Sequence, residues 1–177
     1  TELKKPTVVA EMPVHADLAD LIPALAQSPY KGPSAKHLEW LAWCQERHKR
    51  YPIVLSEYWH NQLINPYCFM QVLYESLAED QIIVAANGTA CVVGFQAAHL
   101  QKGQRLWTNS GCAAMGYDLP AAIGASKGNG SKPVVCLAGD GSIMMNLQEV
   151  QTIVANKLPI KIMLLNKAKC SIHIKNN

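Results

Sequence analysis

The chain has 177 residues, of which 49% are hydrophobic and 16% charged, and this composition excludes a largely disordered protein. The net charge of +3 is too small to indicate a nucleic-acid partner. No leader sequence opens the chain, and no apolar run approaches the roughly 18 residues that a membrane helix needs. We therefore expect a cytoplasmic globular protein with neither a nucleic-acid nor a membrane partner.

The cysteines give no sign of a zinc site. They stand at positions 44, 68, 91, 112, 136 and 170, and no two of them form a CxxC or CxC pair. Structural zinc sites need such closely spaced ligands. Cys91 and Cys136 lie in apolar runs, where cysteine is commonly a small buried hydrophobic residue, so we expect reduced thiols.

Residues 1–33 carry five prolines and one short helical pattern, from Ala16 to Leu25. This composition indicates a linker or the tail of a neighbouring domain. From Ser34, which can cap a helix, the pattern is helical until Pro52. We therefore divide the chain into a linker, residues 1–33, and a domain, residues 34–177.

The domain alternates helices with short apolar strands. Asn65 and Pro66 predict the start of a helix, with Phe69, Val72 and Leu73 on its buried face. Further helices are expected over 91–100, from 119 and from 147, and strands over 81–86, 105–108, 134–138 and 160–165. The strands lack polar alternation, which is typical of strands buried on both faces. We predict an α/β domain with a mostly parallel sheet and helices on both faces.

The carboxyl ends of the strands are the expected ligand crevice of such a sheet. The run Gly139-Asp140-Gly141-Ser142 directly follows a buried strand. Glycines let an anionic ligand approach the backbone N–H groups, and Asp140 offers the hard oxygen that Mg²⁺ prefers. Asn166 follows the next strand, so it could meet Asp140 on one cation. These residues predict a site for a metal ion and a diphosphate.

The segment after this site has a helix-start pattern. Asn146 is a candidate N-cap, and Glu149 stands three residues later, as in a capping box. Leu147, Val150 and Val154 would then form the buried face of the helix. We therefore assign Glu149 a structural role and no part in acid–base chemistry.

These motifs resemble those of a known family. A GDG run followed, 26 residues after Asp140, by Asn166 resembles the fingerprint of thiamine diphosphate-dependent enzymes. Two longer runs, 109–125 and 139–153, look like the acetolactate synthase branch of that family. The resemblance covers roughly residues 65–166, and the preceding segment is similar to the family's interdomain linker. It implies the thiamine diphosphate-binding fold of the C-terminal domain, truncated at its C-terminus.

The resemblance implies roles for the residues after the third strand. Asp140 and Asn166 would lie at Mg²⁺. The diphosphate of thiamine diphosphate would be held by the backbone of Gly141 and Ser142, with Gly139 at the strand end.

Two further loops would complete the cofactor site. Asn87, Gly88 and Thr89 stand at a strand end that contacts phosphate in the family. Met115 matches the bulky residue that supports the bent cofactor between its two rings, with Gly116 beside it. A large apolar side chain can support a ring while a neighbouring glycine leaves room for it, so the residue types agree with these roles.

The chain departs from the family pattern after Asn166. Lys167 stands where the family usually has a second asparagine, and the glycine that follows two residues later is missing. An ammonium group has no lone pair to donate to a cation, so the pattern does not identify the residue that would be the third metal ligand. Two alternatives remain open for this segment. A register shift of one residue could place Asn166 at the metal, or Lys167 and Lys169 could contact phosphate.

The resemblance implies the thiamine diphosphate- and Mg²⁺-binding portion of a 2-oxo acid carboligase or decarboxylase, a transferase or lyase that is an oligomer. The family's activating glutamate belongs to a pyrimidine-binding domain, which the same full-length chain or a second subunit would supply. We therefore expect residues 1–177 alone not to catalyse the reaction of a 2-oxo acid. The alternative is a non-catalytic remnant that keeps the fold for oligomerisation or ligand binding.

Overall fold

The computed structural model describes residues 2–7, 9–29, 32–166 and 171–174. The chain divides into two compact units, Thr1–Arg50 and Tyr51–Asn177. A cofactor domain that begins at residue 34 stays a prediction. No helix in the described part of the chain combines the length and the apolar character needed to cross a membrane.

The first unit holds the short helix η1 (Glu2–Lys4) and the helices α1 (Leu18–Ala26) and α2 (Ala35–Arg50). The carboxylate of Asp17 caps α1 by accepting a hydrogen bond from the Ala19 N–H at 2.8 Å. The predicted cap of α2 is confirmed, because the Ser34 hydroxyl accepts from the His37 N–H at 3.4 Å. Neither α1 nor α2 has a buried residue.

The second unit is built around a five-stranded sheet with the strand order β2-β1-β3-β4-β5. The strands are β1 (Ile82–Ala85), β2 (Arg105–Trp107), β3 (Val134–Gly139), β4 (Ile160–Asn166) and β5 (Ser171–Ile174). The first four run parallel, and β5 pairs antiparallel with β4. The predicted mostly parallel α/β sheet is confirmed.

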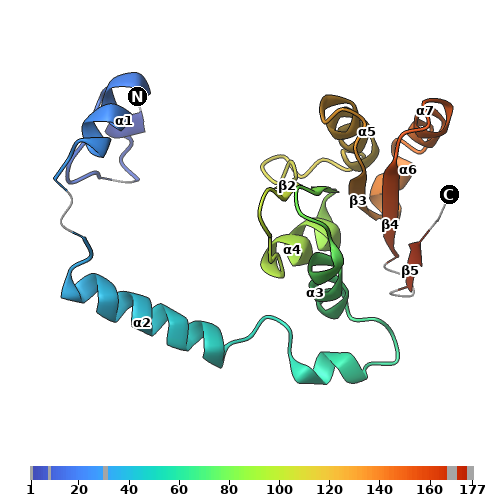
Figure 1. Ribbon diagram of the computed structural model, residues 1–177, viewed down its shortest axis with the longest axis horizontal. Helices are drawn as coiled ribbons and strands as arrows, with labels where there is room; N and C mark the ends of the chain where they lie inside the picture. Colours follow the sequence, from blue (N-terminus) through green and yellow to red (C-terminus); the bar gives the residue numbers. More distant parts are fainter. Residues whose placement is uncertain (1, 8, 30–31, 167–170, 175–177) are drawn as a thin grey trace. The chain divides into compact units, whose positions relative to one another are not determined.

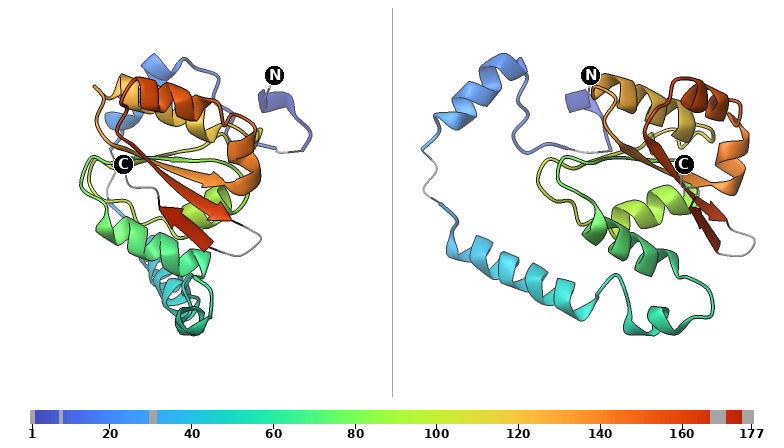
Figure 2. Two further views of the ribbon diagram at one scale, coloured as in Figure 1. Left: turned by 90° about the vertical axis from the view of Figure 1, so that its right-hand side faces the viewer. Right: turned by 45° about the vertical axis from the view of Figure 1, so that its right-hand side comes forward.

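Helices cover both faces of this sheet, as predicted. The helices of this unit are α3 (Pro66–Ser76), α4 (Gly88–Gln96), α5 (Asp118–Gly128), α6 (Asp140–Met144) and α7 (Glu149–Ala155), and the short helix η2 (Ser56–His60) packs on α3. Figures 1 and 2 show α3 and α4 on one face and α5 and α7 on the other. The predicted start of α3 is confirmed, because the Asn65 side chain accepts from the Tyr67 N–H at 2.9 Å.

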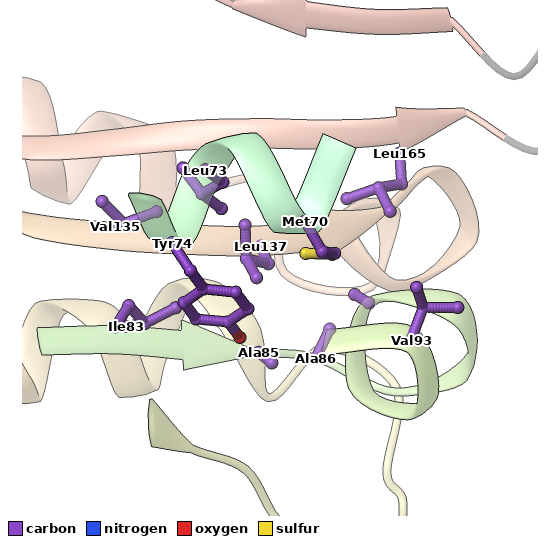
Figure 3. Close-up of a cluster of buried hydrophobic side chains, with 11 residues drawn as sticks. Met70, Leu73, Tyr74, Ile83, Ala85, Ala86, Val93, Val135, Leu137 and Leu165 are labelled. Atoms are coloured by element: carbon purple, nitrogen blue, oxygen red, sulfur yellow. The ribbon is translucent and has the colours of Figure 1, made fainter. Parts of the chain in front are cut away.

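Two apolar clusters, one on each face, hold the layers together. Met70 and Tyr74 of α3 pack on Ile83 of β1 and Leu137 of β3 (Figure 3). Val84, the neighbour of Ile83, belongs to the cluster on the opposite face. Successive strand residues point to opposite faces, and both faces are covered, so the strands carry apolar residues without alternation.

The structure corrects the predicted buried face of α3. Met70, Leu73 and Tyr74 are buried, whereas Val72 is exposed and Phe69 is only partly buried. The reason is Tyr74, whose hydroxyl donates to the Gly94 carbonyl of α4 at 2.9 Å and so allows the ring to be buried. A buried tyrosine hydroxyl normally needs such a partner.

The start of α7 also differs from the prediction. The helix begins at Glu149 rather than directly after Asn146. The buried residue of α7 is Ile153, and the predicted Val150 is partly buried against the same cluster, while Leu147, which precedes the helix, and Val154 are exposed. The capping-box prediction is wrong, because the Asn146 side chain is engaged with a different segment.

The buried Tyr74 links stability to pH. Burial raises its pKa from 10.0 to about 12. As the pH rises above 10, the unfolded chain releases this proton before the folded chain does, so folding becomes less favourable. We expect Tyr74→Phe to cost about 1 kcal/mol near neutral pH, with a difference that shrinks above about pH 10 and reverses in sign before pH 12, because the wild type alone loses stability there. Urea denaturation of both proteins across this range measures it, and a difference independent of pH would contradict the assignment.

Candidate functional site

The carboxyl edge of the sheet brings together residues from several loops. Gly139, the last residue of β3, pairs with Leu165 of β4, so Asp140, which directly follows β3, and Asn166, the last residue of β4, come next at the same edge of the sheet. Neighbouring strands lie about 4.8 Å apart. The two side chains predicted to serve a metal ion therefore start from adjacent positions at one edge.

Asp140 is the first residue of α6. The sequence predicted the next helix only from residue 147, whereas Asp140–Met144 form a short helix directly after β3. One carboxylate oxygen of Asp140 accepts a hydrogen bond from the Gly141 N–H at 3.0 Å. This bond holds the half-buried carboxylate against the turn that begins the helix.

Ser142 joins this turn to the loop that precedes α5. Its side chain is 2% exposed, and its Oγ accepts from the Gly116 N–H at 2.9 Å. The Gly116 carbonyl accepts from the side-chain amide of Asn146 at 2.7 Å. Both polar groups of the Gly116 residue are thus held by side chains from the segment 142–146.

Gly116 has a φ of +81°, a conformation that L side chains rarely adopt. A Cβ at this position would lie 2.8 Å from both the Asn146 amide nitrogen and the Met145 Cβ. Close packing and backbone conformation therefore both require glycine here.

Met115, the predicted support for the cofactor, is 45% exposed. Its methyl carbon lies over Gly141, where an added Cβ would be only 3.2 Å away. The side chain therefore reaches from the loop before α5 to the turn that carries Asp140. The structure brings Met115, Gly116, Gly141 and Ser142 together, as a shared site requires.

A third segment reaches the same loop from β1. The sequence predicted a helix from Cys91, but α4 begins at Gly88, which makes Asn87 its N-cap residue. The Asn87 side chain does not cap the helix; it donates to the Ala113 carbonyl at 3.3 Å. Thr89 is exposed in the first turn, where backbone N–H groups lack partners within the helix and suit an anion.

Three features of the site were missed from the sequence. Asn146 was assigned to a helix cap, and the donor role of its amide carries no sequence signal. Ala113 adopts a φ of +50° although it is not glycine. Asp118 is fully buried at the start of α5, and one of its oxygens accepts from the Leu119 N–H at 2.8 Å.

The buried Asp118 also affects a neighbouring thiol. Burial raises the pKa of the Cys136 thiol, and the negative charge of Asp118 raises it further. Cys136 is therefore kept in its neutral form, which agrees with the prediction of a small buried hydrophobic residue. The five described cysteines, at positions 44, 68, 91, 112 and 136, are free thiols.

The donor set at the edge fits a hard cation that shares its ligands with a phosphate. Among the described residues no three His, Cys, Asp or Glu side chains converge on one point. Asp140 and Asn166 offer a carboxylate and an amide oxygen, and Mg²⁺ is usually held by one or two such groups together with substrate phosphates. Lys167 and Lys169, whose roles were left open, lie outside the described residues.

Residues 86–171 match the family described as thiamine pyrophosphate enzyme, C-terminal TPP binding domain. This segment begins directly after β1 and contains β2, β3 and β4, together with the segments that follow β1, β2 and β3 at the carboxyl edge.

Several curated proteins are similar to the chain. The acetolactate synthase isozyme 1 large subunit of Escherichia coli (strain K12) is 30% identical over 165 residues, which are 93% of this chain and 28% of that protein. Acetolactate synthase 2, chloroplastic, of Nicotiana tabacum is 39% identical over 132 residues, 73% of this chain and 20% of that protein. The chain thus spans between a fifth and a third of the length of these relatives.

Proposed function

We propose that this chain, which belongs to the thiamine pyrophosphate enzyme family and is similar to acetolactate synthases, provides the thiamine diphosphate- and Mg²⁺-binding part of an enzyme acting on 2-oxo acids. The observation that carries the proposal is the pairing of Gly139 with Leu165. This pairing places the backbones of Asp140 and Asn166, the residues that follow, next to each other at the carboxyl edge. Such an edge is where parallel α/β sheets bind their ligands.

Each segment of the edge has a separate task in this proposal. Asp140 and Asn166 would hold Mg²⁺, which would neutralise the charge of the diphosphate. The backbone of Gly141 and Ser142, together with the first turn of α4 at Gly88, binds the diphosphate oxygens. Bound thiamine diphosphate supplies an electron sink for reactions that break a bond next to a carbonyl group.

Met115 and the loop around it position the organic part of the cofactor. The Met115 side chain is exposed at the edge and apolar, so it can pack against a ring and exclude water there. The buried Gly116 next to it holds the loop in place and does not make room for the ring, because Asn146 and Met145 already fill the position of its missing Cβ. In this arrangement the chain binds and orients the cofactor, and the cofactor supplies the reactive atoms.

The remaining parts of the proposal concern the whole enzyme. A transferase or lyase activity on a 2-oxo acid would require a pyrimidine-binding domain, from the same full-length chain or from a second subunit, in an oligomer. A cytoplasmic location stays a prediction, since some similar proteins are described as chloroplastic.

Isothermal titration with thiamine diphosphate tests the proposal. With Mg²⁺ we expect binding, and chelation of the metal should weaken it at least about tenfold, because the diphosphate is held through the cation. Asp140→Ala should remove this dependence on Mg²⁺. Glu149→Gln, which neutralises a nearby carboxylate in the first turn of α7, should retain it. Absence of heat, or binding indifferent to Mg²⁺, would instead favour a remnant that keeps only the fold.

A further inference from the structure

The strongest unexplained feature of the site is the Asn146 side chain. It comes from the turn between α6 and α7, yet its amide donates to the Gly116 carbonyl, 30 residues earlier in the chain. Its Oδ1 accepts from the side-chain amide of Gln148 at 3.2 Å. The two bonds together fix the orientation of the amide. If the amide were flipped, its oxygen would face the Gly116 oxygen and its NH₂ group would face the Gln148 NH₂ group.

Asn146 does not serve the helix beside it. Asparagine is a preferred N-cap, but the N-cap residue of α7 is Gln148, which makes no side-chain capping bond. The best capping residue of this segment is therefore committed to Gly116 instead. This use of the side chain is what would be expected if the position of Gly116 mattered more than the start of α7.

The bond to Gly116 also determines where Met115 lies. Gly116 is fixed at its N–H by Ser142 and at its carbonyl by Asn146, in a conformation with φ +81°. Met115 is the preceding residue, and its methyl carbon lies against Gly141. A change at the Gly116 carbonyl therefore moves Met115 relative to the turn of Asp140 and Gly141.

We propose that Asn146 is a positioning residue, which acts through the Gly116 carbonyl to hold Met115 at a fixed distance from Gly141. This inference rests on the proposed function, because the distance it sets is the one between the support for the cofactor ring and the turn that binds the diphosphate. Asn146 touches neither the metal nor the diphosphate in this proposal.

The test variant is Asn146→Asp, which keeps the size of the side chain but replaces the donor by an acceptor facing the Gly116 oxygen. The matched control is Asn156→Asp. Asn156 also donates its amide to a backbone carbonyl, that of Thr152 at 2.9 Å, but at the exposed end of α7. Asn146→Ala serves as a second variant if the aspartate disturbs folding, which far-ultraviolet circular dichroism detects.

The first readout needs no ligand. The full chain is labelled with ¹³C in the methionine methyl groups, and the Met115 resonance is assigned with Met115→Leu. We expect Asn146→Asp to shift this resonance towards that of free methionine, and Asn156→Asp to leave it in place. An unchanged Met115 resonance in both Asn146 variants would overturn the proposal. This result is independent of whether the chain binds thiamine diphosphate.

The second readout separates positioning from general damage. Titrations compare thiamine diphosphate with magnesium pyrophosphate, which occupies only the diphosphate turn. Asn146→Asp should weaken thiamine diphosphate at least about tenfold, as expected for loss of one well-placed bond, and leave pyrophosphate within about twofold. Equal loss for both ligands, or no loss for either, would overturn the positioning role. Failure of the wild-type chain to bind either ligand would overturn the proposed function, and the Met115 resonance would still decide whether Asn146 holds the loop.

Discussion

Replacement of Gly116 by Ala is expected to weaken the binding of thiamine diphosphate at least about tenfold and to lower the free energy of unfolding by about 1–3 kcal/mol. The added Cβ would lie 2.8 Å from both the Asn146 amide nitrogen and the Met145 Cβ, and the residue would keep an unfavourable φ of +81°. To relieve both, the loop must move away from the segment 142–146. That movement would break the hydrogen bonds to Ser142 and Asn146 and displace Met115.

Gly124→Ala is the matched control for this prediction. Gly124 lies within α5 in ordinary helical conformation, and a Cβ there would meet nothing within 4 Å. Alanine is favoured over glycine in a helix by about 1 kcal/mol, so this variant should be as stable as the wild type or more so. Urea denaturation and isothermal titration measure both variants. Equal behaviour of the two would show that the geometry of Gly116 is unimportant.

The sequence was sufficient to predict the four parallel strands and the edge at which Asp140 lies, but not the antiparallel strand β5. Strands covered on both faces are short apolar runs, and residues such as Asp140 that directly follow them must lie at the carboxyl edge. The 26-residue interval to Asn166 is long enough for a helical crossover, and the structure shows α6 and α7 in it. Order along the chain and strand direction therefore determine which residues share the edge.

The contacts that connect the loops could not be predicted in the same way. Asn146 is equally suited to cap a helix or to donate to a carbonyl, and only the approach of Gly116 in space decides between these roles. Tyr74 was not among the residues predicted to be buried, and the partner that allows its burial, the Gly94 carbonyl, belongs to another helix. In both cases the deciding partner is 20 or more residues distant.

Truncation of a side chain in the core beneath the site is expected to cause a large loss of stability. Leu137 is fully buried in β3, the strand between β1 and β4, and packs in the cluster that contains Met70 and Tyr74 (Figure 3). We expect Leu137→Ala to lower the free energy of unfolding by about 2–5 kcal/mol, because a rigid sheet cannot collapse into the space that the side chain leaves. Leu100→Ala, at a leucine that is 45% exposed, should cost much less.

Leu137→Ala also tests whether the core affects ligand binding at the carboxyl edge in any way other than by keeping the chain folded. Its cluster lies on the face covered by α3 and α4, whereas the hydrogen bonds that hold Gly116 lie at the carboxyl edge. Under conditions where Leu137→Ala remains folded, its affinity for thiamine diphosphate and Mg²⁺ should therefore equal that of the wild type. Urea denaturation followed by circular dichroism gives the stability, and titration at low temperature gives the affinity. A stability loss no larger than that of Leu100→Ala, or a folded variant that binds tenfold more weakly, would show that β3 and the loops at its end are not separable in this way.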